Sequence, residues 1–155
     1  AFLGAAMGAA IRPVGGWLSD KFGGARVTQW STALMIGAAL ASAWVIQKAN
    51  TSAQPETWFL PFLSLFILLF ATTGIGNGST FRMIAVIFPK ELAGPVLGWT
   101  SAVAAYGAFL IPTIFAMQIK AGKPEYALYG FAVYYVTCLL LNWWYYARKN
   151  AEVPC

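Results

Sequence analysis

Histidine is absent from this sequence, and only two cysteines, Cys138 and Cys155, are present. Zinc and most other transition-metal sites are assembled largely from these two residue types, so we expect no metal site. Two cysteines are also too few for the disulfide framework of a small secreted domain.

Acidic residues are scarce as well, and none of the five lies inside a long apolar segment. They fall in or beside the polar connections, at Asp20, Glu56, Glu91, Glu125 and Glu152. With no histidine, no intramembrane carboxylate and no nucleophile beside a base, the sequence predicts no enzyme active site. It offers no phosphate-binding loop either, because the glycine-rich stretch GIGNGST follows no strand and is not completed by Gly-Lys-Ser/Thr. We therefore expect no cofactor.

What the sequence has in abundance is apolar residues. It is 59% hydrophobic and 10% charged, with a mean hydropathy of +0.65. That composition is typical of a polytopic membrane protein and lies outside the range of ordinary soluble domains. The formal net charge is +5, but the basic residues flank apolar segments instead of forming one basic face, so nucleic acid is not an expected partner.

Crossing a bilayer takes about 20 mostly apolar residues. Five segments are predicted to span it, the first of them truncated: residues 1–18, 27–46, 58–88, 96–119 and 126–147. The fold class is therefore predicted to be all-α, with residues 1–155 forming part of a polytopic membrane helix bundle. The chain begins inside a helix and without Met, so we interpret it as a fragment whose N-terminal half is missing, and Cys155 as a natural terminus.

Alternation of the connections across the membrane divides the basic residues into two sets. One set contains Lys21, Arg26, Lys90, Arg148 and Lys149. The other contains Lys48, Lys120 and Lys123. Because cytoplasmic loops carry an excess of Lys and Arg, we expect the larger set and the C-terminus to be cytoplasmic. The chain is therefore expected to be an integral membrane protein, with membrane lipid as a partner.

Arg12 is the most informative residue, because it lies within the apolar segment AFLGAAMGAAIRPVGGWL. An Arg at the centre of a bilayer costs about 2.5 to 3.5 kcal/mol by insertion scales, and intramembrane charges usually mark substrate pathways. On a helical projection it shares a stripe with small residues, namely Ala5, Gly8, Gly15 and Ser19. We expect these to leave room for a bound anion beside the guanidinium. The competing interpretation is that the stripe packs against a helix while Arg12 extends to the cytoplasmic edge.

Two later segments also carry small residues. In ATTGIGNGSTFRMI, the polar groups of Asn77 and Ser79 and the exposed backbone at Gly76 are candidate contacts for a small polar solute, or parts of a packing seam. In the next segment Gly98 and Ser101 lie on a thin helix face opposite bulky side chains. Such a face permits close sliding contact with another helix, in a transporter or in a static bundle.

The connection GGWLSDKFGGARV places glycines around charged residues at the predicted cytoplasmic edge. Its notable residues are Gly16, Asp20, Lys21, Gly24 and Arg26, which form either a solvated tight loop or, as the resemblance described next implies, a gating latch. The glycines permit a tight reversal, while Asp20 and Arg26 are suited to ionic contacts with helix ends and neighbouring side chains.

This connection resembles the G-x-L-x-D-[RK]-x-G-x-[RK] signature of cytoplasmic loops in the major facilitator superfamily. Together with IRP, GIGNGSTFRMIAVIF and GWTSAVAAYGAFLIP, it makes the whole chain resemble the C-terminal part, helices eight to twelve, of a nitrate/nitrite porter. The resemblance implies that Arg12 binds the anion and that the second nitrate signature of the family falls on residues 98–109, where Gly98 and Gly107 match. Nitrate and nitrite are then the expected solutes, with exchange slightly favoured over proton-coupled uptake.

Two alternatives stay open at this level. The chain could belong to a transporter of another small anion, since Arg12 specifies charge better than identity. It could instead be a non-transporting membrane subunit that anchors or senses, in which case Arg12 would bind lipid or a partner helix.

Overall fold

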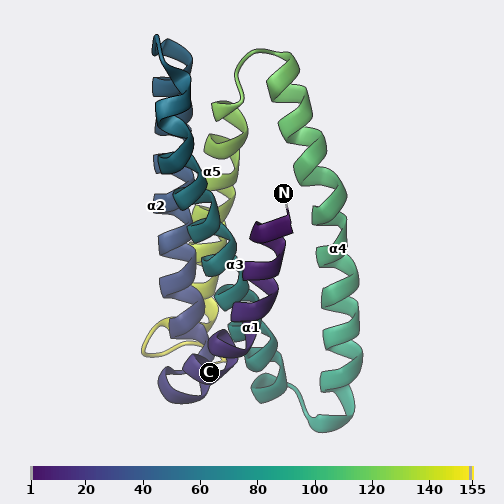
Figure 1. Cartoon of the computed structure of the whole chain (residues 1–155). Coiled ribbons are helices and arrows are strands. Elements are labelled where there is room, and N and C mark those ends of the chain that lie inside the picture. The colour runs from purple at the N-terminus through teal and green to yellow at the C-terminus, as the bar shows by residue number, and fades with distance from the viewer. Residues whose placement is uncertain (1, 154) are drawn as a thin grey trace.

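Five long helices make up the computed structural model, which describes residues 2–153 and 155 (Figure 1). The elements are α1 (Phe2–Phe22), α2 (Gly24–Thr51), the short 3-10 helix η1 (Pro55–Trp58), α3 (Phe59–Ile87), α4 (Lys90–Lys120), α5 (Glu125–Asn142) and the π-helical turn η2 (Trp143–Ala147). No strand occurs in the described residues. The predicted all-α class is confirmed.

α1, α2 and α4 run a few residues beyond the apolar segments read from the sequence, whereas α3 stays within residues 58–88. For example, α2 begins at Gly24 and ends at Thr51, whereas the apolar segment covers residues 27–46. Hydropathy marks the part of a helix that suits the lipid core, but backbone hydrogen bonding continues into the polar ends. The connections are short, and two of them turn at glycines with positive φ, Gly23 at 87° and Gly122 at 71°.

α2 is the central helix of the packed part of the bundle. It packs along α3 on one side and α5 on another, while α1 lies mainly against α3 (Figure 1). Most of the buried side chains of α2 are small, including Ala25, Ala38, Ala39, Ser42 and Ala43. Small side chains let helix backbones approach closely, which is the main source of packing energy between helices in lipid.

α4 stands apart from this packed group (Figure 1). None of its described residues is buried, and its contacts are limited to its neighbours in sequence, α3 and α5. Trp99, Tyr106 and Phe109 are each about 70% exposed. An apolar helix with this much uncovered surface needs lipid or further protein around it.

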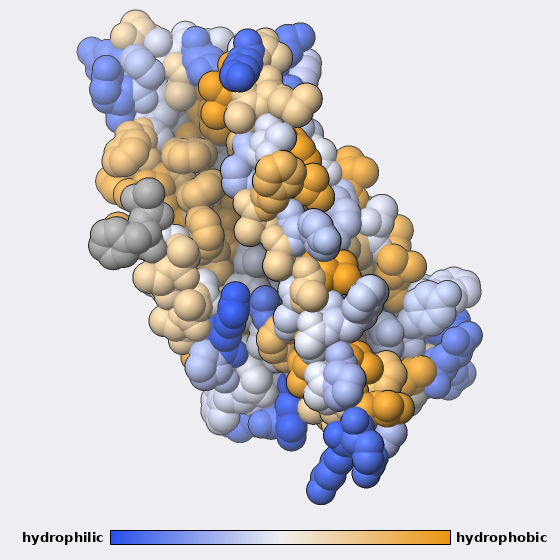
Figure 2. Space-filling view, turned by 90° about the vertical axis from the view of Figure 1, so that its right-hand side faces the viewer, coloured by the Kyte–Doolittle hydropathy of each residue, from blue (hydrophilic) through white to orange (hydrophobic). Residues whose placement is uncertain are grey.

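Four helical stretches are long and apolar enough to cross a membrane: Gly24–Thr51, Pro55–Ile87, Lys90–Lys120 and Glu125–Ala147. The remaining helix, α1, is shorter and includes Arg12, Asp20 and Lys21. Strongly hydrophilic residues gather toward the two ends of the molecule, with a mainly apolar band between them (Figure 2).

The helices alternate in direction along the bundle (Figure 1). The α1–α2 connection, the α3–α4 connection and the end of α5 therefore lie at one end, and the α2–α3 and α4–α5 connections lie at the other. The two sets of basic residues are thus at opposite ends, as alternation of the connections requires. Which end faces the cytoplasm remains a prediction from the excess of basic residues.

Candidate functional site

The Arg12 side chain is exposed on the surface of α1. Within residues 2–153 and 155, the structure gives its guanidinium no ion pair and no hydrogen bond. Arg12 precedes Asp20 by eight positions, which corresponds to a helical rise of about 12 Å. Half the thickness of the hydrocarbon core of a bilayer is about 15 Å. In the hydrocarbon core of a bilayer, a cation at that distance from the helix end would be costly without an acceptor.

The backbone at Arg12 is held tightly although its side chain is not. A Cβ atom built on Gly78 of α3 would overlap the carbonyl group of Arg12, and one built on Gly74 would overlap the carbonyl of Gly8. In the other direction, Gly15 of α1 leaves no space for a Cβ beside the backbone of Ile75. Glycine on both helices therefore fixes α1 against α3, and with it the starting point of the Arg12 side chain.

These contacts correct one sequence-based expectation. The small residues Gly8 and Gly15 do not leave room for a ligand beside Arg12, because α3 fills the space next to them. Ser19 is also buried and donates its hydroxyl to the Gly15 carbonyl at 2.8 Å. The expected stripe is thus divided: Gly8, Gly15 and Ser19 belong to the packed side of α1, whereas Ala5 and Arg12 lie on its exposed side.

The glycine-rich segment of α3 contacts α1 and α2 with different residues. Ser79 is fully buried, and its hydroxyl lies 2.8 Å from that of Thr28 and donates to the Gly76 carbonyl at 2.9 Å. A Cβ on Gly76 would lie 3.2 Å from the Ser31 hydroxyl oxygen. Ser79 and Gly76 therefore face α2. The two were expected among the solute contacts, but the structure places both in a helix–helix seam.

Asn77 differs from these neighbours. Its side chain is half-buried, and its Oδ1 atom is fully buried yet accepts no hydrogen bond within the described residues. A buried polar atom without a partner is unusual and costs roughly 1–3 kcal/mol. Of the polar side chains predicted for the solute site on α3, Asn77 is the one that retains unused hydrogen-bonding capacity.

The candidate residues of α4 are not brought to Arg12. Gly98 and Ser101 are exposed, and Gly107 is half-exposed. A Cβ on Gly98 would meet nothing within 4 Å, and one on Gly107 would meet only Ile111 of the same helix. The thin face of α4 is therefore open in this chain, consistent with a surface made for another helix.

At the α1–α2 connection, the ion-pair partner of Asp20 is Arg82, whose Nε donates to the Asp20 carboxylate from near the end of α3. Arg26, which the sequence suggested for this cluster, is exposed and lines a different cavity. Lys21 instead lies over the Trp17 ring, 4.6 Å from its centroid.

The glycines of this connection differ in their surroundings. Gly23 makes the reversal by itself, with φ 87°, a conformation that side chains other than glycine rarely adopt. Gly24 is buried against Met83 and Ser79 of α3, so that α2 can begin close to that helix. Gly16 has open space around it.

Sequence reasoning overlooked a polar contact between α2 and α5. The side chain of Asn142 is buried and donates from Nδ2 to the Ala25 carbonyl at 2.9 Å and to Oε1 of Gln29 at 2.7 Å. Asn142 could have been noticed as a polar residue at the end of the apolar run CLLLN. Such hydrogen bonds between membrane helices contribute modestly, about 0.6 kcal/mol on average.

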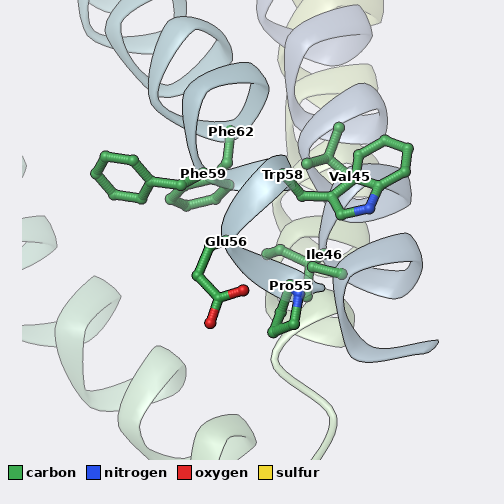
Figure 3. A pocket seen from close by; sticks show the side chains of 8 residues that line it. Val45, Ile46, Pro55, Glu56, Trp58, Phe59 and Phe62 are labelled. Carbon is green, nitrogen blue, oxygen red and sulfur yellow. The ribbon is translucent and has the colours of Figure 1, made fainter. Parts of the chain in front are cut away.

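A cavity of about 520 Å³ lies at the opposite end of the bundle, between the end of α2 and the start of α3 (Figure 3). Its lining is apolar apart from Glu56, and includes Val45, Trp58, Phe59 and Phe62. It has no basic residue to attract an anion, so it is not a candidate for the site that Arg12 suggests. The described residues also hold no cluster of three or more His, Cys, Asp or Glu side chains that could bind a metal ion.

The antiparallel apolar helices, the charged ends and the small-residue seams define an integral membrane protein of the polytopic helix-bundle class. A family profile described as Major Facilitator Superfamily matches residues 1–154, and the chain belongs to that superfamily.

Its relatives include nitrate/nitrite transporters. The chain is 42% identical to the "Probable nitrate/nitrite antiporter NarK2" of Thermus thermophilus, and the alignment covers all of this chain and 34% of that protein. It is 37% identical to the "Nitrate/nitrite transporter NarU" of Escherichia coli, and the alignment covers 97% of this chain and 36% of that protein. A "Citrate-proton symporter" of Klebsiella pneumoniae is 34% identical over 90% of the chain and 30% of the relative.

These similarities confirm the resemblance to the nitrate/nitrite porter family. The chain spans about a third of the length of the curated relatives it matches.

Proposed function

We propose that this chain is the C-terminal part of a transporter that carries nitrate, nitrite or both across the bacterial inner membrane by alternating access. The observation that carries the proposal is the exposed guanidinium of Arg12 in the apolar segment of α1, which has no ion-pair partner within the described residues. The names of the two nitrate/nitrite transporters support the choice of anion.

A guanidinium suits these anions for a physical reason. Nitrate and nitrite are planar oxyanions, and the guanidinium offers coplanar N–H donors in a fixed arrangement together with a permanent charge. The glycine contacts between α1 and α3 fix the backbone of Arg12, so little backbone freedom is lost when the anion binds. A second cation from the part of the transporter outside this chain would complete a clamp between the two halves.

Among the other predicted contacts, Asn77 has the strongest support from the geometry. Its Nδ2 group can donate to an anion oxygen, whereas its buried Oδ1 is an acceptor and would need a donor of its own, such as a water molecule or the other half of the transporter. For Gly98, Ser101 and Gly107 we propose an indirect role, in which the thin face of α4 packs against the absent part of the transporter and borders the anion path. Gly76 and Ser79 would then shape the site through the α2–α3 seam.

We propose that the α1–α2 connection gates the cytoplasmic side. Asp20 and Arg82 join α1 to α3, and Lys21 beside them adds a charge for contact with the other half of the transporter. Gly24 permits close approach of α2 to α3 there, Gly16 leaves open space for contact with the other half, and Arg26 lies just beyond the turn. Contacts of this kind form in one state of a rocking transporter and break in the other.

Exchange of nitrate for nitrite is slightly favoured over proton-coupled uptake. Proton relays in membranes are usually built from Asp, Glu or His within the spans. None of those residue types lies inside the apolar segments of this sequence. A proton-linked group in the rest of the transporter would reverse that preference.

The second candidate is a transporter of another small anion, which the citrate–proton symporter among the relatives favours. That relative is named for a different anionic substrate, citrate, and this supports the second candidate. A non-transporting anchor or sensor subunit is the third candidate, in which Arg12 contacts lipid or a partner helix.

The test is flux through the full-length protein reconstituted in liposomes. Labelled nitrate uptake is measured against internal nitrite, with and without a proton gradient, for the wild type, Arg12→Lys and the control Lys123→Arg at the opposite end of the bundle. We expect nitrite-dependent uptake, a loss of at least about ten-fold in uptake efficiency for Arg12→Lys, and no change for Lys123→Arg.

Other outcomes separate the candidates. Gradient-dependent uptake without internal nitrite would indicate proton symport. Competition by citrate or formate but not by nitrite would favour the other-anion transporter. No flux in any condition would support the anchor, and full activity with Lys at position 12 would remove the binding role from Arg12.

A further inference from the structure

A second cavity, of about 480 Å³, lies where the α1–α2 connection meets the end of α5. Its walls come from two stretches far apart in sequence. The first includes Arg26, and the second includes Tyr146, Arg148, Lys149 and Cys155. The volume falls within the range of small-ligand sites. Neither the anion path nor the Asp20–Arg82 contact accounts for this cavity.

The side chains that line this cavity carry a net positive charge. Arg26, Arg148 and Lys149 contribute three cations, and no acidic side chain is among its described lining residues. Burial raises the pKa of the Cys155 thiol, so the thiol adds no negative charge. With Cys155 as the predicted terminus, its carboxylate would offset one of the three cations and leave the lining net positive. Like charges that share one cavity repel one another unless an anion lies between them.

Arg148 also has an unused donor. Its guanidinium lies over the Trp144 ring, 4.6 Å from the centroid, which holds the group in one orientation. Its Nε atom is fully buried and has no acceptor within the described residues. A buried donor on a charged group is costly to leave unpaired, so an acceptor brought by a ligand would stabilise this arrangement.

The neighbouring aromatic residues set the depth of the cavity. Tyr146 lines it directly, and Trp143, Trp144 and Tyr145 precede it in η2. Aromatic rings of this kind concentrate at the headgroup level of a bilayer. The cavity therefore lies where a lipid phosphate would be found, at the end of the bundle with more basic residues.

We propose that this cavity binds a phosphate group, and specifically that of an anionic membrane phospholipid. Arg26 and Arg148 provide the paired N–H donors that match phosphate oxygens, and Lys149 adds a third cation. The depth given by the aromatic residues favours a lipid over free phosphate as the source. The proposal does not depend on which anion the protein transports.

Native mass spectrometry of the full-length protein in detergent tests the proposal. Phosphatidylglycerol is titrated in, with zwitterionic phosphatidylcholine as the reference lipid. The variants are Arg26→Gln and the double substitution Arg148→Gln/Lys149→Gln. The matched control is Lys120→Gln/Lys123→Gln, which removes the same charge from the opposite end of the bundle. We expect the affinity for phosphatidylglycerol to fall about five-fold for each charge removed from the cavity, and to stay unchanged in the control.

A second arm identifies the source of the phosphate. Inorganic phosphate is added at millimolar concentration to the complex with phosphatidylglycerol. Failure to displace the lipid supports the lipid source, and displacement would show a site for free phosphate, which overturns the lipid assignment.

Equal binding of both lipids, or equal loss in the cavity and control variants, would overturn the site itself. Arg26 is exposed, so Arg26→Gln tests the cavity without threatening the fold, and thermal unfolding of each variant verifies this.

Discussion

At the scale of single residues, Arg12 and Arg82 differ in whether the protein provides an ion-pair partner. Arg82 has a protein partner in Asp20, whereas Arg12 has none within the described residues. The sequence singles out Arg12, because a lone charge in an apolar run is conspicuous. It does not reveal the Asp20–Arg82 pair, because the two residues are 62 positions apart and only the packing of α1 on α3 brings them together.

The strength of the Asp20–Arg82 pair limits what it can do for gating. The side chains of Arg82 and Asp20 are 49% and 53% exposed. Ion pairs with that exposure contribute only about 0.2 to 1 kcal/mol, because water and salt screen them. A contact of this size shifts a two-state equilibrium by at most about five-fold. In the gate proposed above, such a pair would bias the equilibrium between open and closed states without locking either one.

We therefore expect Asp20→Asn to change the rate of nitrate uptake by no more than about five-fold, with the larger effect at low ionic strength. The charge exchange Asp20→Arg/Arg82→Asp should restore much of the loss. Initial uptake rates in liposomes at two salt concentrations measure both effects. A loss of a hundred-fold that the exchange does not repair would show that Asp20 acts through something other than this pair.

At the scale of elements, the α1–α3 contact is the feature that glycine makes possible. Gly8 and Gly15 on α1 and Gly74 and Gly78 on α3 place one helix backbone against the other. The helices themselves follow readily from the sequence, because an apolar run in lipid must satisfy its backbone hydrogen bonds internally. Which helix a glycine face meets does not follow, because a stripe of small residues is compatible with a ligand, a lipid or any other helix.

Substitution at this contact should destabilise the protein. Gly78→Ala places a methyl group into the Arg12 carbonyl, and overpacking of this kind costs about 1–3 kcal/mol. Gly37→Ala and Gly130→Ala are matched controls, because a Cβ at either position meets nothing within 4 Å and alanine favours a helix. Thermal unfolding in detergent should show a lowered transition for Gly78→Ala alone. An unchanged transition would mean that the two helices separate easily, contrary to the close packing described above.

At the scale of the whole molecule, the packed group of α1, α2, α3 and α5 contrasts with the isolated α4. The sequence predicts all five helices and their alternation, but gives no sign that one of them would lie uncovered. The apolar composition of a segment is enough to predict that it forms a membrane helix. Whether that helix is buried depends instead on which other helices pack around it. About two thirds of the length of the relatives lies outside this chain, which is where those neighbours would be found.

The uncovered face of α4 and the single arginine of the site lead to one prediction at this scale. Residues 1–155 expressed alone should give no nitrate uptake in cells that lack their own transporters. Co-expression with the remainder of the full-length protein as a separate chain should restore it, because membrane helices assemble through packing without a covalent link. Uptake by residues 1–155 alone would contradict the interpretation that Arg12 is half of a site.

The lone charge of Arg12 also bears on membrane voltage. With the second cation proposed above, the site would hold two positive charges when empty and one when it binds a monovalent anion, and the field acts only on net charge. Moving one elementary charge across 100 mV is worth about 2.3 kcal/mol. The membrane voltage would therefore act more strongly on reorientation of the empty site than on that of the loaded one.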